Sequence, residues 1–241
     1  MFLLLAQVIL TLESFGAPLV YPLNAPLQHV QGIETDGRRL WVSSVDKEAK
    51  TGHLHLFEIA TGKLLQTVRV DSGDMFHPGG MSLEGSSLWV PVAEYKRIGR
   101  SRIEQRDKQT LLLRSYFTVD DHIGCVAING KKLIGGNWDA RQIYTWSLKG
   151  AQLTRQENPQ STHYQDMKFR QGQLIASGVL DKNAGAIDWL NPRDLGLLKR
   201  VTAGKTDRGV LFTNEGMTQF GGKLYLLPED GPSRLFVFQL P

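Results

Sequence analysis

Alternation of apolar and polar residues dominates the chain after its first 17 residues. Runs such as HLHLFEI from His53, QIYTWSL from Gln142 and KLYLLP from Lys223 alternate with a period of two and are rich in aromatic and β-branched residues. After residue 15, no window with a helical period is long enough for a helix. The pattern therefore predicts an all-β protein.

Five segments of the chain repeat one another. Each holds a short strand, a turn with glycine and a second strand, and they begin at His29, His77, His122, Tyr164 and Asn214. The turn glycines are Gly37, Gly85, Gly130, Gly172 and Gly222, at intervals of 48, 45, 42 and 50 residues. Glycine supplies the positive φ that a tight hairpin requires. Repeats of this period are typical of propeller blades.

The number of strands in each repeat supports the same fold. In the first four repeats a second hairpin follows the first, which gives four antiparallel strands in about 46 residues, the content of a blade. The fifth repeat ends after RLFVFQL without a fourth strand, and residues 18–24 (PLVYPLN) are one spare strand. We therefore predict a single domain over residues 18–241, a five-bladed propeller whose ring is closed by the N-terminal strand. A β-sandwich and an open β-solenoid are the alternatives.

The N-terminus has the pattern of a secretory signal. Residues 2–12 are mostly apolar and are followed by Ser-Phe-Gly-Ala, although no Lys or Arg precedes Arg38. Residues 1–17 are therefore predicted to be a signal peptide or its remnant, and the protein to be secreted or periplasmic. The alternative is a first strand or helix of the domain. No later apolar run approaches the ~18 residues that a membrane span needs.

Composition narrows the classes of function. The chain has 241 residues, 41% of them hydrophobic, which is enough for a full core. A formal charge of +4, spread along the chain, does not indicate nucleic-acid binding. The single cysteine, Cys125, excludes an intrachain disulfide and a thiolate zinc cluster. No nucleotide-binding loop, nucleophile elbow or HExxH motif is present. A small-molecule ligand or substrate is the expected partner.

Polar residues recur at equivalent places in the repeats. Eight residues before each turn glycine stand His29, His77, His122, Tyr164 and Asn214, with His163 beside Tyr164. Seventeen residues further on stand Asp46, Glu94, Asp139 and Asp181, and in the fifth repeat Asp230 follows at sixteen, beside Glu229. The first strand of a blade starts at the face where the second strand ends, one strand spacing away. These groups are therefore expected around the mouth of the central channel.

Several imidazoles around one point suit a transition metal, and a carboxylate behind each would fix its tautomer. A divalent metal is thus predicted on four ligands: His29, His77, His122 and His163. The residues expected to bind a ligand are Tyr164, Asn214, Asn137, Trp138, Asp46, Glu94 and Asp139. Trp138 beside a carboxylate suits a sugar or an aromatic ring. Acid–base catalysis is assigned to Glu215, Asp166 and Gln165.

Two classes of function fit these residues. The first is a metal-dependent hydrolase or lyase that acts on a small polar substrate. The second is a non-enzymatic propeller that binds a ligand or a protein, in which each His–acid pair is a structural staple copied by duplication. A quinone-dependent redox enzyme has no supporting residue beyond analogy of fold.

Runs across most of the chain resemble a family of exported bacterial proteins of unknown function. The runs are HVQGIETDGRRLWVSS, FHPGGMSLEGSSLWVPVAEY, GGNWDARQIYTW, YQDMKF and NEGMTQFGGKLYLLPEDGPSRLFVF. The resemblance implies a quinoprotein-like or gluconolactonase-like propeller and no established activity. Glu215 in NEGM resembles the metal-binding Glu-Gly of gluconolactonase-type propellers, which implies a divalent metal and lactone hydrolysis. Those propellers have six blades and lack the histidines.

Overall fold

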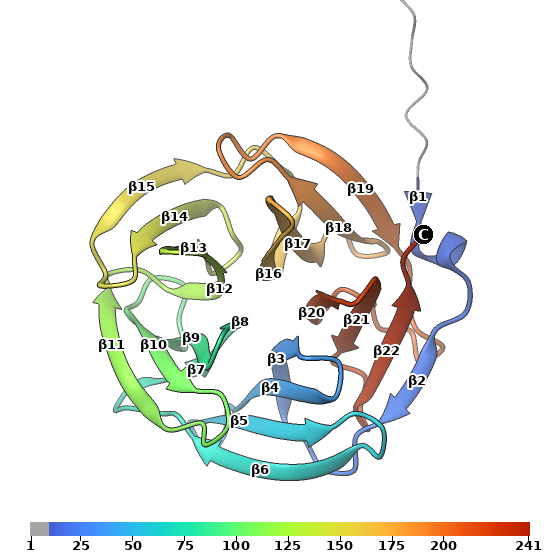
Figure 1. Ribbon diagram of the computed structural model, residues 1–241, viewed down its shortest axis with the longest axis horizontal. Coiled ribbons are helices and arrows are strands. Elements are labelled where there is room, and N and C mark those ends of the chain that lie inside the picture. Colours follow the sequence, from blue (N-terminus) through green and yellow to red (C-terminus); the bar gives the residue numbers. More distant parts are fainter. Residues whose placement is uncertain (1–9) are drawn as a thin grey trace, which may run out of the picture.

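The computed structural model describes residues 10–241, and its strands form five sheets arranged around a central axis (Figure 1). Each sheet is one blade, and the blades of consecutive repeats lie side by side around the ring. The prediction of an all-β, five-bladed propeller is confirmed. Within residues 10–241, no helix is long and apolar enough to cross a membrane.

The strands of each blade run outward from the axis in chain order. Blade one comprises β3 (His29–Thr35), β4 (Arg39–Asp46), β5 (Thr51–Glu58) and β6 (Lys63–Arg69). Blade two comprises β7 (Met75–Pro78), β8 (Ser82–Glu84), β9 (Ser87–Glu94), β10 (Ser101–Asp107) and β11 (Leu113–Val119). Blade three comprises β12 (Ile123–Asn129), β13 (Lys132–Asn137), β14 (Gln142–Ser147) and β15 (Gln152–Glu157).

The last two blades include strands from the N-terminus. Blade four comprises β16 (His163–Arg170), β17 (Gln173–Val179), β18 (Gly185–Leu190), β19 (Leu197–Ala203) and the added β1 (Leu10–Thr11). Blade five comprises β20 (Glu215–Phe220), β21 (Lys223–Pro228), β22 (Arg234–Gln239) and β2 (Leu19–Pro22). The antiparallel pairing of β2 with β22 completes blade five, as the spare strand predicted, and joins the two ends of the chain in one blade.

The N-terminal segment packs against blade four before it reaches blade five. β1 pairs in parallel with β19, and a short 3₁₀ turn (Leu12–Phe15) follows it. Leu12 is fully buried in the apolar cluster between blades four and five. Of the predicted signal segment, residues 1–17, the first nine lie outside the described residues, and residues 10–15 make these contacts.

Apolar side chains fill the space between neighbouring blades. Trp41 and Leu54 of blade one pack with Met81 and Leu88 of blade two, and four further clusters of this kind complete the ring. Alternate residues of each strand face these clusters, which explains the period of two in the sequence. Cys125 belongs to one of them as a buried free thiol.

The innermost strands approach so closely that their glycines have no room for a side chain. A Cβ on Gly32 would lie 2.4 Å from Gly80 Cα, and a Cβ on Gly79 would lie 1.9 Å from Gly124 O. The backbone of Gly80 bonds to blade three, donating to Gly124 O at 2.8 Å and accepting from Val126 N at 2.9 Å. This contact separates β7 from β8 and narrows the central channel.

Asp166 is buried among the innermost strands of the ring. Its buried carboxylate accepts hydrogen bonds from the backbone N of Ile33 (3.2 Å) and Met217 (3.1 Å), and it pairs with the buried Lys168 ammonium. The residue therefore connects blade four with blades one and five. Packing at this level leaves a cavity at one end of the axis.

Candidate functional site

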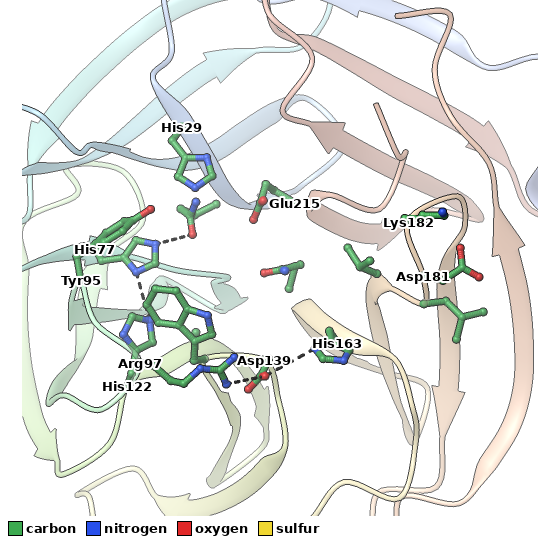
Figure 2. Close-up of a pocket in the computed structure, with 16 residues that line it drawn as sticks. His29, His77, Tyr95, Arg97, His122, Asp139, His163, Asp181, Lys182 and Glu215 are labelled. Carbon is green, nitrogen blue, oxygen red and sulfur yellow. Dashed lines mark hydrogen bonds and ion pairs between the residues drawn. The ribbon is translucent and has the colours of Figure 1, made fainter. Parts of the chain in front are cut away.

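A cavity of about 440 Å³ lies at the end of the axis where the innermost strands begin. The four predicted histidines, His29, His77, His122 and His163, all line it, as do Gln165 and Glu215 (Figure 2). The repeat offset therefore predicted that these side chains gather at one end of the propeller. The four histidines nevertheless take three different environments.

His29 lies beside two carboxylates, and we call His29, Glu215 and Glu229 the acidic group. One potential ligand atom from each residue lies within 4.8 Å of the others. His29 begins β3, Glu215 begins β20, and Glu229 follows β21, where its backbone N donates to Asn214 O at 2.8 Å. The first and last blades thus meet here.

Polar atoms of the acidic group lack hydrogen bonds. His29 Nδ1 lies 2.9 Å from Glu229 Oε1, but the direction of approach does not make a hydrogen bond, and this nitrogen is buried. The Glu215 carboxyl group is buried and makes no side-chain hydrogen bond to residues 10–241. Burial, with the nearby Glu229 and Asp166 carboxylates, raises the pKa of Glu215 to about 8.

His77 and His122, which we call the imidazole pair, form a continuous chain of hydrogen bonds. His77 Nδ1 lies 3.2 Å from His122 Nε2, and His77 Nε2 lies 2.7 Å from the Gln31 amide. His122 Nδ1 lies 2.8 Å from Glu94 O and 3.0 Å from Lys96 O. All four ring nitrogens are therefore engaged.

The proton positions follow from the acceptors at the end of this chain. Burial lowers the pKa of both imidazoles, that of His77 well below its usual value, and so both are neutral at pH 7. His122 must use Nδ1–H to donate to the two carbonyls, which leaves Nε2 to accept from His77 Nδ1–H. The His77 Nε2 lone pair then requires the Gln31 amide to turn, so that its NH₂ takes the place of Oε1 and gives up its hydrogen bond to Val30 O. Neither imidazole has a lone pair free for a metal.

His163 lies apart from both groups. Its side chain is half exposed, and Nδ1 lies 3.7 Å from Asp139 Oδ2, which accepts a hydrogen bond from Arg97 at 2.7 Å. The predicted four-histidine metal site is therefore not formed. Within residues 10–241, three potential ligands converge only at the acidic group, of which one member is a histidine.

Two aromatic side chains cover the imidazole pair on the cavity side. The Trp138 ring meets the His122 ring edge-on at 4.5 Å between centroids, and the Tyr95 ring lies 4.4 Å from that of His77. Trp138 and Tyr95 are themselves perpendicular at 5.9 Å. Both residues line the cavity.

The remaining predicted site residues do not line the cavity. Tyr164 is buried, and its hydroxyl donates to Asp188 at 2.6 Å. Asp166 is buried and bonds to blades one and five, as described above. Glu94 pairs with Lys96 at 2.9 Å and with Arg100 at 3.2 Å. Asp46 and Asn137 cap turns, and Asn214 offers its backbone oxygen to Glu229.

The expected pairing of each histidine with the acid of its own repeat is wrong. The carboxylate beside His29 belongs to blade five, and the one beside His163 belongs to blade three. The contacts run between blades because the first strands of neighbouring repeats adjoin at the axis. Sequence reasoning missed Gln31 and Tyr95 as cavity residues and noted Glu229 only as a neighbour of Asp230. Gln31 could have been found, since it is two residues after His29 on the same face of β3.

Fold and cavity define a five-bladed propeller with a carboxylate- and imidazole-lined pocket at one end. The chain matches the family of unknown function DUF6454 over residues 19–173, more than half of its length, and belongs to that family. No curated protein is detectably similar in sequence.

Solved structures share the architecture at low identity. Glutaminyl cyclase from Myxococcus xanthus aligns with a TM-score of 0.70 and 12% identity over 92% of this chain and 94% of its own. A chain of the nidogen/laminin complex aligns with a TM-score of 0.54 and 16% identity over 89% and 77%. The Neurospora crassa Pan2 WD40 domain gives 0.50 and 11% over 86% and 60%. These likenesses concern the fold alone.

Proposed function

We propose that the protein binds a divalent metal ion at the acidic group and acts as a hydrolase or lyase on a small polar substrate held in the cavity. The observation that carries this proposal is the convergence of one imidazole and two carboxylates within 4.8 Å. The group borders a cavity large enough for a small molecule.

The chemistry of the donors fits such an ion. One histidine nitrogen and two carboxylate oxygens suit zinc, manganese or iron. His29 Nδ1 is buried without a hydrogen bond, 2.9 Å from Glu229 Oε1, whereas buried polar atoms are normally partnered. A divalent cation would also offset the repulsion between the carboxylates of Glu215 and Glu229.

A bound ion would supply a Lewis acid that polarises a carbonyl group or lowers the pKa of water. The chain itself provides the binding surface around it. Gln165 and His163 at the start of β16 face the cavity and offer hydrogen bonds to a polar substrate.

Equilibrium dialysis with Zn²⁺ and Mn²⁺ tests the metal site. The wild-type protein is expected to bind one equivalent, and His29→Ala and Glu215→Gln to bind at least about 100-fold more weakly. His163→Ala, which changes another histidine of the same cavity, is the matched control and keeps wild-type affinity. Absence of binding by the wild type, or equal binding by all variants, would refute the proposal. Turnover of small lactones and esters, with and without the ion, then tests the reaction class.

A second candidate is the reaction of the Myxococcus xanthus enzyme, cyclisation of a glutaminyl group. The observation in its favour is that the alignment covers nearly the whole of both chains. Incubation with a glutaminyl peptide, followed by mass spectrometry for the cyclised product, distinguishes the two. Product formation that persists in the metal-free protein would favour this candidate over the metal-dependent one.

Export remains part of the proposal. Its support is the apolar segment before residue 13 and the small residues after it. N-terminal sequencing of the protein recovered from cell fractions tests it, and recovery of the uncleaved chain from the cytosolic fraction alone would contradict it.

A further inference from the structure

Tyr95 and Trp138, which we call the aromatic wall, line the cavity that Glu215 also lines. Trp138 lies in the loop between β13 and β14, and Tyr95 follows β9, so that the wall is built by blades two and three. The acidic group comes from blades one and five. The cavity therefore has two chemically different parts supplied by different blades.

The wall is held in place by contacts behind it. Phe76 stacks on Tyr95 with 5.9 Å between centroids, and the rings of the imidazole pair support Tyr95 and Trp138. His77 and His122 are fixed in turn by their four engaged nitrogens. A ligand that stacks on this surface finds the rings already oriented, which lowers the entropy cost of binding.

The remainder of the lining is strongly polar. Gln165, His163 and Lys182 offer hydrogen bonds, and Arg97 and Asp139 form an ion pair at the rim. Val179 and Leu180 are the aliphatic side chains of the lining. A ligand that fits has an apolar face for the wall and many polar groups around its edge, which is the surface of a saturated, polyhydroxylated ring. A flat aromatic ligand would leave the polar lining without partners.

We propose that the substrate class is the sugar-type ring, with its C–H face on Trp138, its edge toward the perpendicular ring of Tyr95 and its hydroxyl groups toward the polar lining. This inference rests on the proposed function, because it places the sugar-type ring of the substrate at the aromatic wall and the functional group that reacts at His29, Glu215 and Glu229. Sugar lactones, sugar esters and cyclic polyols belong to the class.

Saturation-transfer NMR with four probes tests the assignment. Methyl β-glucoside and inositol are polyhydroxylated rings, cyclohexanol is a ring with one hydroxyl group, and benzyl alcohol is aromatic. The polyhydroxylated probes are expected to bind, Trp138→Ala to weaken them at least about tenfold, and Trp138→Phe to retain part of the affinity. Tyr116→Ala, which removes an exposed aromatic ring from β11, is the control and binds as wild type. Failure of both polyhydroxylated probes, or stronger binding of benzyl alcohol, would overturn the proposal.

The same measurement separates this inference from the metal site. Ring binding that persists in EDTA and in His29→Ala supports the aromatic wall even if no metal binds. A protein that binds metal in dialysis but none of the polyhydroxylated probes keeps the proposed metal site and loses the sugar-type substrate. Urea unfolding of Trp138→Ala and Trp138→Phe confirms that the variants compared are folded.

Discussion

His29 and the imidazole pair occupy equivalent positions in their repeats and yet differ in what their atoms can do. His77 and His122 use every ring nitrogen in hydrogen bonds, whereas His29 Nδ1 is buried without one. The difference arises from the neighbouring blade. Blade three offers His77 another imidazole, and blade five offers His29 two carboxylates. A repeat position thus determines where a side chain lies, and its neighbours determine its chemistry.

The largest effect is expected in the acidic group, where Glu215 should make the stability of the protein depend on pH. The pKa of Glu215 is raised from 4.5 to about 8, so its contribution to stability is present below pH 4.5 and is lost as the pH rises to 8. Without metal, the wild type should therefore lose up to about 5 kcal/mol relative to Glu215→Gln across this range. Urea unfolding at several pH values measures the difference between the two proteins. Parallel pH profiles would show that burial and the neighbouring carboxylates do not raise the pKa of Glu215.

The second largest effect is expected when a histidine side chain of the imidazole pair or of the acidic group is removed. His77→Ala leaves Gln31 and His122 without their partner and opens a cavity, which should cost about 3 kcal/mol. His29→Ala, at the edge of the acidic group, should cost about 1 kcal/mol or less. The free energies of unfolding from urea titrations at pH 7 test the contrast. Equal losses in the two variants would mean that both histidines have the same structural role.

Metal addition should stabilise the protein through the acidic group only. At an ion concentration 100 times the Kd, mass action contributes about 2.7 kcal/mol, which corresponds to a rise of about 5 to 10 °C in Tm for a chain of this size. Differential scanning calorimetry should show the rise in the wild type and not in Glu215→Gln. The opposite result, a rise that disappears only when His122 is replaced, would move the metal to the imidazole pair.

The smallest effect is expected at the rim. Arg97 is two-thirds exposed and pairs with Asp139, and exposed ion pairs are worth roughly 0–1 kcal/mol. Arg97→Met should therefore change the free energy of unfolding by less than about 1 kcal/mol and leave metal affinity unaltered. A change in metal affinity of tenfold or more, measured by dialysis, would show that the rim acts on the acidic group.

The fold was predictable because turn glycines recur at a regular spacing and because the fifth repeat lacks one strand that the N-terminus supplies. The position of a residue within its blade was predictable from the spacing of the turn glycines, and this position placed four histidines at one cavity. The contacts between blades were not predictable. The offset between His29 and Asp46 along one repeat contains no information about Glu229, which enters from the other end of the chain. Ring orientation also depends on backbone acceptors such as Glu94 O, which leave no pattern in the residue types.

The pairing of β2 with β22 has a consequence for how the protein forms during synthesis. Blades one to three consist of strands close in sequence and can assemble as they leave the ribosome, whereas blade five needs residues 19–22 and 234–239 together. His29 and Glu215 come from the two ends that this last step joins. The acidic group is therefore complete only once the ring has closed, and a nascent or truncated chain would have most of its blades without the acidic group.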